Sequence, residues 1–281
     1  MIEKHIHQTA PSYEELPQDY KDNIEKIKNL NPEWKYHFYD DAAVENFIKS
    51  NFDGRIFRLF SKIDKRYGAA RADLFRYLVV FRYGGLYLDI KSTLLTPLDL
   101  ILVDSDTFIT SHWPKILDGV DISAWGKHED LISPEFQNWF IFSDSSNEIL
   151  QKVIDTVLDN IENYNATRDG VGRRGVISLT GPVAYSQVLE KKENIAKIKI
   201  ISNEKLGFVY SIYGINDSKH IRLQKEHYTK LFIPIIKTNL MKTVYLYWRF
   251  RIKNFQTRLI RKFNQNFMPF IDRLSAKNLP S

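Results

Sequence analysis

Short apolar runs alternate with longer amphipathic stretches along most of the chain. Strand patterns occupy residues 4–9, 35–39 and 86–90, and shorter ones residues 107–110, 122–125 and 139–142. Helical periodicity covers residues 17–30, about 41–49, 64–83, 145–161 and 182–191. Strands that alternate with helices predict an α/β fold, in which helices cover the faces of a central sheet.

Residues with strong local preferences mark several boundaries of these elements. Asp40 or Asp41 is suited to cap the helix that follows it, because a carboxylate accepts from the free backbone amides of a first turn. Gly84 and Gly85 end the helix before them, since glycine readily takes the left-handed conformation. Residues 168–175, rich in glycine and arginine, are predicted as a loop, either a phosphate-contacting lid or an exposed flexible segment.

The last part of the chain has a different character. From about residue 240, apolar side chains recur every three or four positions and predict one helical stripe, formed by Trp248, Ile252, Phe255, Leu259, Phe263, Phe267, Phe270 and Leu274. Residues 237–277 hold ten basic residues and one acid, which gives this segment a net charge of +9. The whole chain has a net charge of +6, so the remaining residues have a net charge of −3. We therefore predict a main domain at 1–236 and a basic aromatic helical tail at 237–281.

The basic tail admits three interpretations. Residues 240–275 can lie on an anionic membrane surface, with the apolar stripe down and the basic groups at the headgroups. The stripe can instead pack on the main domain or on a second subunit, and the oligomeric state stays open. The third interpretation, binding to nucleic acid, has no recognisable nucleic-acid-binding fold to support it, so we predict no nucleic-acid partner.

Composition indicates an ordinary soluble protein. Hydrophobic residues make up 43% and charged residues 26% of the 281 positions. The chain has no cysteine, which excludes disulfides, thiolate catalysis and cysteine-based zinc sites. The N-terminus shows no apolar run of signal-peptide length, and no stretch of 18 apolar residues occurs anywhere, so we expect a cytoplasmic location.

Candidate chemistry gathers in residues 71–92. Asp73 and Arg76 are three positions apart and share one face of a predicted helix. Asp89 lies at the carboxyl end of the following strand, where open α/β sheets bind ligands. A carboxylate beside a basic group suits a diphosphate bound with a divalent metal. The simpler interpretation is a helix–turn–strand with a salt bridge on its surface.

The same stretch resembles the donor-site signature of glycosyltransferase family 32, which includes bacterial capsule and lipopolysaccharide transferases and the yeast initiating α-1,6-mannosyltransferase. That signature is roughly Ala-x-x-Asp-Leu-x-Arg-Tyr, followed by Tyr-Gly-Gly-x-Tyr-x-Asp-x-Asp. The chain supplies Ala70, Asp73, Leu74, Arg76, Tyr77, Tyr83, Gly84, Gly85, Tyr87 and Asp89. Weaker similarities follow in the family's order, at residues 6–9, 31–34, 36–40, 138–143 and 180–182.

The resemblance implies a fold and an activity. The fold would be a GT-A-like Rossmann-type mixed sheet flanked by helices. The activity would be transfer of a hexose, with retention of anomeric configuration, from a nucleotide-sugar to a glycan or lipid-linked acceptor in surface polysaccharide synthesis. A UDP-sugar is the preferred donor, although the sequence does not choose between UDP and GDP sugars.

The resemblance also implies roles for individual residues. Asp73 would accept hydrogen bonds from the donor sugar, Arg76 would hold that sugar, and Asp89 would serve the diphosphate and its metal. Asn138 would lie near the anomeric carbon. The remaining nucleotide-sugar contacts would come from His7, Gln8, Thr9, Tyr39, Asp40, Gly85, Tyr87 and Lys91. For His7, Tyr39 and Asp40 the alternatives are a buried histidine, a core aromatic residue and a helix cap.

One position departs from the family pattern, because Lys91 replaces its second aspartate. An ammonium group has no acceptor with which to hold a cation. Lys91 can instead contact the diphosphate directly. Alternatively, Mn²⁺ or Mg²⁺ persists, held by Asp89, phosphate oxygens and a later ligand, for which His220 and His227 are the candidates.

Two other functions compete with transfer. Lys91 is compatible with a non-catalytic protein that binds sugar-nucleotides or glycans through a degenerate site. The basic tail is compatible with a membrane-bound scaffold.

Overall fold

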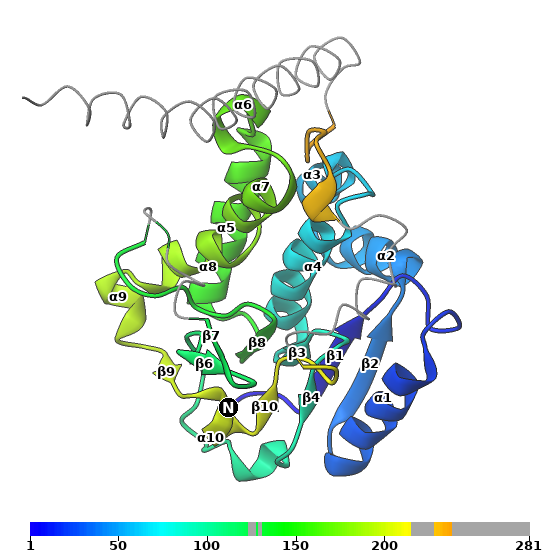
Figure 1. Cartoon of the computed structure of the whole chain (residues 1–281), viewed down its shortest axis with the longest axis vertical. Coiled ribbons are helices and arrows are strands. Elements are labelled where there is room, and N and C mark those ends of the chain that lie inside the picture. The colour runs from blue at the N-terminus through cyan, green and yellow to red at the C-terminus, as the bar shows by residue number, and fades with distance from the viewer. Residues whose placement is uncertain (123–127, 129–130, 215–227, 238–281) are drawn as a thin grey trace, which may run out of the picture.

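The computed structural model describes residues 1–122, 128, 131–214 and 228–237, and its centre is a six-stranded mixed sheet of order β2-β1-β3-β8-β5-β9 (Figure 1). β1 pairs in parallel with β2 and β3, whereas β8 runs antiparallel to β3 and β5. The six strands are β1 (His5–Thr9), β2 (Lys35–Tyr39), β3 (Gly85–Leu88), β5 (Phe108–Thr110), β8 (Phe140–Ser143) and β9 (Lys199–Ile200). The predicted mixed α/β sheet is therefore confirmed.

Two short pairs of strands lie outside the main sheet. The first joins β4 (Thr93–Leu94) to β10 (Phe208–Val209), and the second is the hairpin of β6 (Ile116–Leu117) and β7 (Val120–Asp121). The strand predicted at 122–125 is thus replaced by a hairpin that ends at Asp121, and residues 123–125 of that prediction lie outside the described residues.

Helices cover both faces of the sheet, and each face has its own apolar core (Figure 1). One core joins Tyr87, Phe108 and Ile141 of the sheet to helices that include α4 and α5. The other packs the opposite face, with Ile6 and Leu86, against α1 and the segment around β4 and β10. The helices are α1 (Gln18–Leu30), α2 (Asp41–Asn51), α3 (Gly54–Lys62), α4 (Gly68–Tyr83), α5 (Glu148–Glu162), α6 (Ala166–Asp169), α7 (Gly172–Leu179), α8 (Pro182–Leu189), α9 (Lys192–Ile195) and α10 (Asn203–Leu206), with 3-10 turns η1 (Leu98–Leu100) and η3 (Tyr228–Lys230).

Carboxylates begin two helices that lead to the site. Asp40 is the N-cap of α2, and its Oδ1 accepts from the amide of Ala43 at 2.7 Å. Asp53 caps α3 in the same way, through the amides of Arg55 and Ile56. α3 was not predicted as a helix from the sequence, although its apolar residues at 56, 57, 59 and 60 have helical spacing.

The double glycine turns the chain from α4 into β3 and brings β3 close to β1. Gly84 and Gly85 have φ angles of 66° and 91°, both in the left-handed region. A Cβ atom on Gly85 would lie 2.2 Å from the carbonyl oxygen of His5 in β1. The predicted turn is confirmed, and glycine is needed there for both conformation and space.

The segment predicted as a loop at 168–175 is partly helical. Gly172 begins α7, and Gly175 lies within that helix. A Cβ atom on Gly175 would meet the carbonyl oxygen of Gly170 at 2.8 Å, so the glycines allow α7 to pack against the turn before it. The prediction of a loop, as a lid or as an exposed flexible segment, is therefore wrong for residues 172–175, which begin α7.

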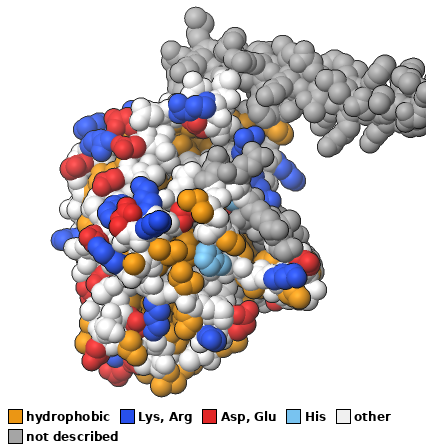
Figure 2. All heavy atoms as spheres, turned by 90° about the vertical axis from the view of Figure 1, so that its left-hand side faces the viewer, with side chains coloured by type: hydrophobic (Ala, Val, Ile, Leu, Met, Phe, Trp, Pro, Cys, Tyr) orange, Lys and Arg blue, Asp and Glu red, His pale blue; other side chains and the backbone are white. Residues whose placement is uncertain are grey.

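The predicted tail lies outside the described residues, apart from Lys237. Within the described part of the chain, no helix combines the length and apolar character needed to cross a bilayer. Figure 2 shows basic and acidic side chains interspersed over the face that forms the left-hand side of Figure 1. That face carries no broad patch of one charge, as expected if the positive charge is concentrated in the tail.

Candidate active site

A cleft of about 720 Å³ lies where β1 and β3 end, beside the first half of α4. Its lining includes Thr9 at the end of β1 and Asp89 directly after β3. On α4 the lining residues Gly68, Ala69 and Ala72 have small side chains, which leave the helix open to close approach by a ligand. The carboxyl ends of parallel strands are where α/β sheets bind ligands.

The Arg76 guanidinium lies between two carboxylates at the wall of this cleft. Its Nη2 is 3.3 Å from Oδ1 of Asp73 and 3.1 Å from Oδ1 of Asp89. The side chains of Asp73 and Arg76 are only 8% and 7% exposed. The pair is therefore buried, and the interpretation as a surface salt bridge is wrong.

Burial makes the three charges of this group depend on one another. Desolvation raises the pKa of Asp73 to about 6, although Arg76 opposes the shift. Desolvation also disfavours the Arg76 cation, but the carboxylates of Asp89 and Asp73 outweigh it and raise the pKa of the guanidinium. Arg76 thus stays charged and holds both carboxylates in place.

Neighbouring polar groups also hold the two oxygens of Asp73. Thr180 Oγ1 donates to Asp73 Oδ2 at 2.9 Å, and the Asn138 amide donates to Asp73 Oδ1 at 3.2 Å and to the Tyr77 hydroxyl at 3.0 Å. Arg76 in turn donates to the carbonyl oxygen of Asn138. These partners come from α4, from the segment before β8 and from the end of α7, so the tertiary fold assembles the site.

Asp89 is held from its backbone and from its side chain. Its amide donates to the carbonyl oxygen of Trp139 at 2.9 Å, and its carbonyl oxygen accepts from the Gln8 amide at 3.2 Å. The Tyr87 hydroxyl donates to Asp89 Oδ1 at 3.3 Å. The Tyr87 ring also lies beneath the Arg76 guanidinium, 5.0 Å from its central carbon.

Lys91 also lines the cleft and is tied to Tyr210. Its Nζ donates to the Tyr210 hydroxyl at 2.7 Å and lies 3.9 Å from the centre of the ring. The backbone is tied as well, because the Ile212 amide donates to the Lys91 carbonyl oxygen and Ser92 Oγ donates to the Tyr210 carbonyl oxygen.

The residues predicted at the end of β1 divide between the cleft and the interior. Thr9 lines the cleft, whereas His7 and Gln8 are fully buried. Gln8 supports Asp89 from behind and accepts from the Tyr36 hydroxyl at 2.8 Å. Direct contact of His7 or Gln8 with a nucleotide stays a prediction that the cleft lining does not support.

Tyr39 and Asp40, predicted near the base and ribose, take structural positions. The Tyr39 ring packs on Phe75 with centroids 5.0 Å apart, and its hydroxyl lies 3.4 Å from His7 Nδ1. Asp40 caps α2. Its neighbour Asp41, rather than Asp40, is the residue that lines the cleft.

Several residues of the site carried no predicted role. Tyr228, in η3, lines the cleft although it lies 137 positions after Lys91. Tyr210 and Tyr77 join the network through their hydroxyls. Thr180 belongs to a segment similar to the family's pattern, but only the fold reveals its bond to Asp73. Tyr77 belongs to the family signature, whereas Tyr210 and Tyr228 are isolated in the sequence and carry no local signal that distinguishes them from core residues.

The described residues do not fit a divalent metal ion. Of the three predicted ligands Asp89, His220 and His227, the two histidines lie outside the described residues. Asp89 has a guanidinium on Oδ1 and Lys91 two positions later. Across the described part of the chain, no group of three His, Cys, Asp or Glu side chains is arranged to hold a metal.

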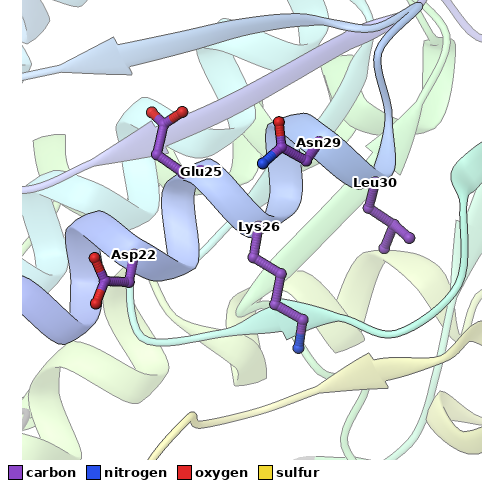
Figure 3. A pocket seen from close by; sticks show the side chains of 5 residues that line it. All are labelled: Asp22, Glu25, Lys26, Asn29 and Leu30. Carbon is purple, nitrogen blue, oxygen red and sulfur yellow. The ribbon is translucent and has the colours of Figure 1, made fainter.

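A second, shallow hollow lies on the surface of α1, and its lining does not resemble that of the cleft. Figure 3 shows its five side chains, which all come from one helix and spread apart: Asp22, Glu25, Lys26, Asn29 and Leu30. No second element contributes to the lining and no polar groups converge. We assign no function to it.

Comparisons with known proteins confirm the family resemblance. Residues 17–109 match the family model described as a glycosyltransferase sugar-binding region containing a DXD motif. The mannosyl phosphorylinositol ceramide synthase of Saccharomyces cerevisiae is 32% identical over 102 residues, which are 36% of this chain and 26% of that protein. An uncharacterized glycosyltransferase of Acanthamoeba polyphaga mimivirus is 36% identical over 90 residues, which are 32% of this chain and 35% of that protein. The chain therefore spans about a quarter to a third of these relatives.

A solved structure supports the fold. The glycosyltransferase domain of the YGT toxin, solved with UDP bound, superposes with a TM-score of 0.50 at 11% identity. The match covers 77% of this chain and 82% of that domain. The predicted GT-A-like arrangement is thereby confirmed for the fold.

Proposed function

Because residues 17–109 carry a sugar-binding region of the family 32 type, we propose that this protein is a retaining glycosyltransferase. It would move a hexose from a nucleotide-sugar to a glycan or a lipid-linked acceptor. The observation that carries the proposal is the buried Arg76 guanidinium, which lies between Asp73 and Asp89 at the wall of the cleft. Burial of the Asp73 and Arg76 charges costs free energy of desolvation, and binding of a polar ligand at the site would account for their presence.

The geometry supports a division of labour among these residues. The Asp73 carboxylate, fixed by Thr180 and Asn138, would hold Arg76 at the wall of the cleft; Asp73 does not itself line the cleft, so its direct contact with the donor sugar stays a prediction. Arg76 and Lys91 would offset the charge that grows on the leaving diphosphate. The carboxylates would stabilise positive charge in the oxocarbenium-like transition state. Asn138 would act mainly by orienting Asp73, and its contact near the anomeric carbon stays a prediction.

The small side chains of α4 support the placement of the nucleotide. Gly68, Ala69 and Ala72 line the same cleft as Thr9 and Arg76, and their small side chains would let the nucleotide approach the helix closely. The predicted contact of Thr9 with the nucleotide fits this arrangement.

The donor sugar and the acceptor are a further part of the proposal. A UDP-hexose is the preferred donor. The printed name of the Saccharomyces relative makes mannose a second sugar to test and an inositol-containing ceramide lipid an example of a lipid-linked acceptor. A role in capsule or lipopolysaccharide synthesis, a cytoplasmic location and a membrane contact through residues 240–275 belong to the same proposal.

The predicted Mn²⁺ or Mg²⁺ does not enter the proposed reaction. Of its predicted ligands only Asp89 is among the described residues, and the positive groups around Asp89 do not fit a cation there.

A non-catalytic sugar-nucleotide-binding protein is the second candidate function, because Lys91 departs from the family's metal-binding pattern. Such a protein would bind the nucleotide without turnover. The two functions therefore differ in one measurable property, which is release of sugar from the donor.

Hydrolysis of a panel of UDP- and GDP-hexoses, mannose donors included, tests the proposal. The wild-type protein should release sugar from at least one donor. Asp73→Ala and Asp89→Asn should each lower the rate by about a hundredfold or more, the usual effect of removing a positioned polar group from a reacting centre. Circular dichroism should show both variants folded. Nucleotide binding without any turnover would support the binding protein, and near-wild-type turnover in either variant would exclude this site.

A further inference from the structure

We propose that the donor site works without a divalent metal ion, and that Lys91 supplies the positive charge which the family pattern assigns to that ion. The inference rests on the proposed function, because it concerns the diphosphate of the same donor. It is carried by the contacts of Asp89, Arg76, Lys91 and Tyr210.

Asp89 is already engaged by a cation. Its Oδ1 lies 3.1 Å from Arg76 Nη2 and also accepts from the Tyr87 hydroxyl. The Arg76 side chain is 7% exposed, so water screens its charge poorly. Arg76 and Asp89 both match the family pattern, so the feature that distinguishes this site from a metal site is Lys91 in place of the second aspartate.

Among the described residues that line the cleft, Lys91 is the cation available for an anion. Four other basic residues line the cleft, and each is paired with a carboxylate: Lys65 and Arg71 with Glu45, Arg66 with Asp64, and Arg76 with Asp73 and Asp89. The Nζ of Lys91 instead donates to the neutral hydroxyl of Tyr210, and none of the ion pairs among the described residues includes it.

The position of Lys91 is fixed before any ligand arrives. Its ammonium lies 3.9 Å from the centre of the Tyr210 ring, and its backbone is tied to Ile212. Tyr210 is itself held edge-on by Trp113 and Trp139, with centroids 5.1 and 5.7 Å away. A side chain restrained in this way loses little conformational entropy when it binds, which favours a role in ligand binding.

The charge balance explains how one lysine can replace an ion. Exchanging an aspartate for a lysine changes the local charge from −1 to +1. The difference of two positive charges equals the charge of one Mn²⁺ or Mg²⁺. Asp89 and Lys91 together have a net charge of zero, as do the family's two carboxylates with their divalent ion. A bound diphosphate would therefore experience the same net charge in both sites.

Isothermal titration of the full chain with UDP and with GDP tests the inference, once in EDTA and once in Mn²⁺. Wild-type affinity for the nucleotide that binds should be the same in both solutions, within about threefold. Lys91→Ala should weaken binding about 10- to 100-fold in EDTA, the size of a lost charge-assisted contact. Lys91→Asp, which rebuilds the second carboxylate, should bind weakly in EDTA and recover affinity in Mn²⁺.

Lys26→Ala is the matched control, since Lys26 is an exposed lysine on α1 (Figure 3). It should keep wild-type affinity. Two results would overturn the inference: wild-type binding that requires Mn²⁺, or full affinity of Lys91→Ala in EDTA. Binding of neither nucleotide to the folded wild type under any condition would overturn the proposed function itself, and the inference with it.

Discussion

At the scale of single residues, His7 lies close to the site but has a structural role in the sheet. It is fully buried, donates from Nε2 to the carbonyl oxygen of Gly84 at 3.0 Å, and stacks on His37 with centroids 5.1 Å apart. Burial lowers the pKa of His7 to about 3 and that of His37 to about 4. Both imidazoles are therefore neutral in the folded protein at physiological pH.

This burial predicts that the protein loses stability in mild acid. In the unfolded chain the pKa of His7 returns to about 6.5, so between pH 6.5 and about 3 the unfolded state binds a proton that the folded state does not. The contribution of His7 to the free energy of unfolding should be constant above about pH 6.5. As the pH drops below 6.5, this contribution should decrease by up to about 1.4 kcal/mol per pH unit. Urea unfolding at pH 7.5, 6.0 and 5.0 measures the slope. His7→Gln should reduce the slope and leave the part that His37 contributes, and an equal slope in this variant would contradict the assignment.

Asp73 titrates close to neutral pH, which predicts an acid limit for activity. Its carboxylate must be charged to hold the Arg76 guanidinium at the wall of the cleft, so kcat/KM for donor hydrolysis should fall as pH drops through about 6. Thr180 favours the charged form by donating to it, so Thr180→Val should move the acid limit to higher pH. Thr180→Ser should restore the original profile. A Thr180→Val enzyme that is merely slower at every pH would show that Thr180 has only a structural role.

At the scale of elements, much of the arrangement follows from periodicity and from glycine. Helix α4 and strand β3 lie where the pattern of residues 64–90 predicts them, and the Asp73–Arg76 contact follows from their spacing on one helix turn. Helix α7 could not be predicted, because its glycines suit a loop in isolation and are required here by close packing. The contact between Lys91 and Tyr210 joins residues 119 positions apart, which no local pattern reveals.

The close approach of β3 to β1 at Gly85 predicts that alanine destabilises the protein more at this position than at Gly119 in the β6–β7 hairpin. Gly85 and Gly119 both have positive φ, but a Cβ on Gly85 would lie 2.2 Å from the His5 carbonyl oxygen, whereas one on Gly119 would have nothing within 4 Å. Alanine at either position should cost roughly 1 kcal/mol or more for the left-handed conformation. Gly85→Ala should be less stable than Gly119→Ala by at least about 2 kcal/mol, because β3 must move from β1. Guanidinium unfolding of both variants measures this, and equal losses would refute the steric argument.

At the scale of the whole molecule, the division predicted from charge separates a compact domain from a basic tail. Deletion of residues 240–281 should abolish binding to vesicles that contain anionic lipid, because the basic residues of the tail supply the electrostatic attraction and its apolar stripe supplies the buried area. Cosedimentation at low and at physiological salt measures it, with neutral vesicles as the control. Undiminished binding of the shortened chain would show that the tail is not the membrane contact.

The cleft draws its lining from distant parts of the sequence, from Thr9 in the first strand to Tyr228 in η3. Nearly the whole described chain must therefore be synthesised and folded before the cleft exists. A nucleotide that binds there binds only the folded state, and at a hundred times its Kd it would add about 2.7 kcal/mol to the free energy of unfolding. Under the proposed function, a plentiful supply of donor in a cell would therefore lower the unfolded fraction of this protein and slow its degradation.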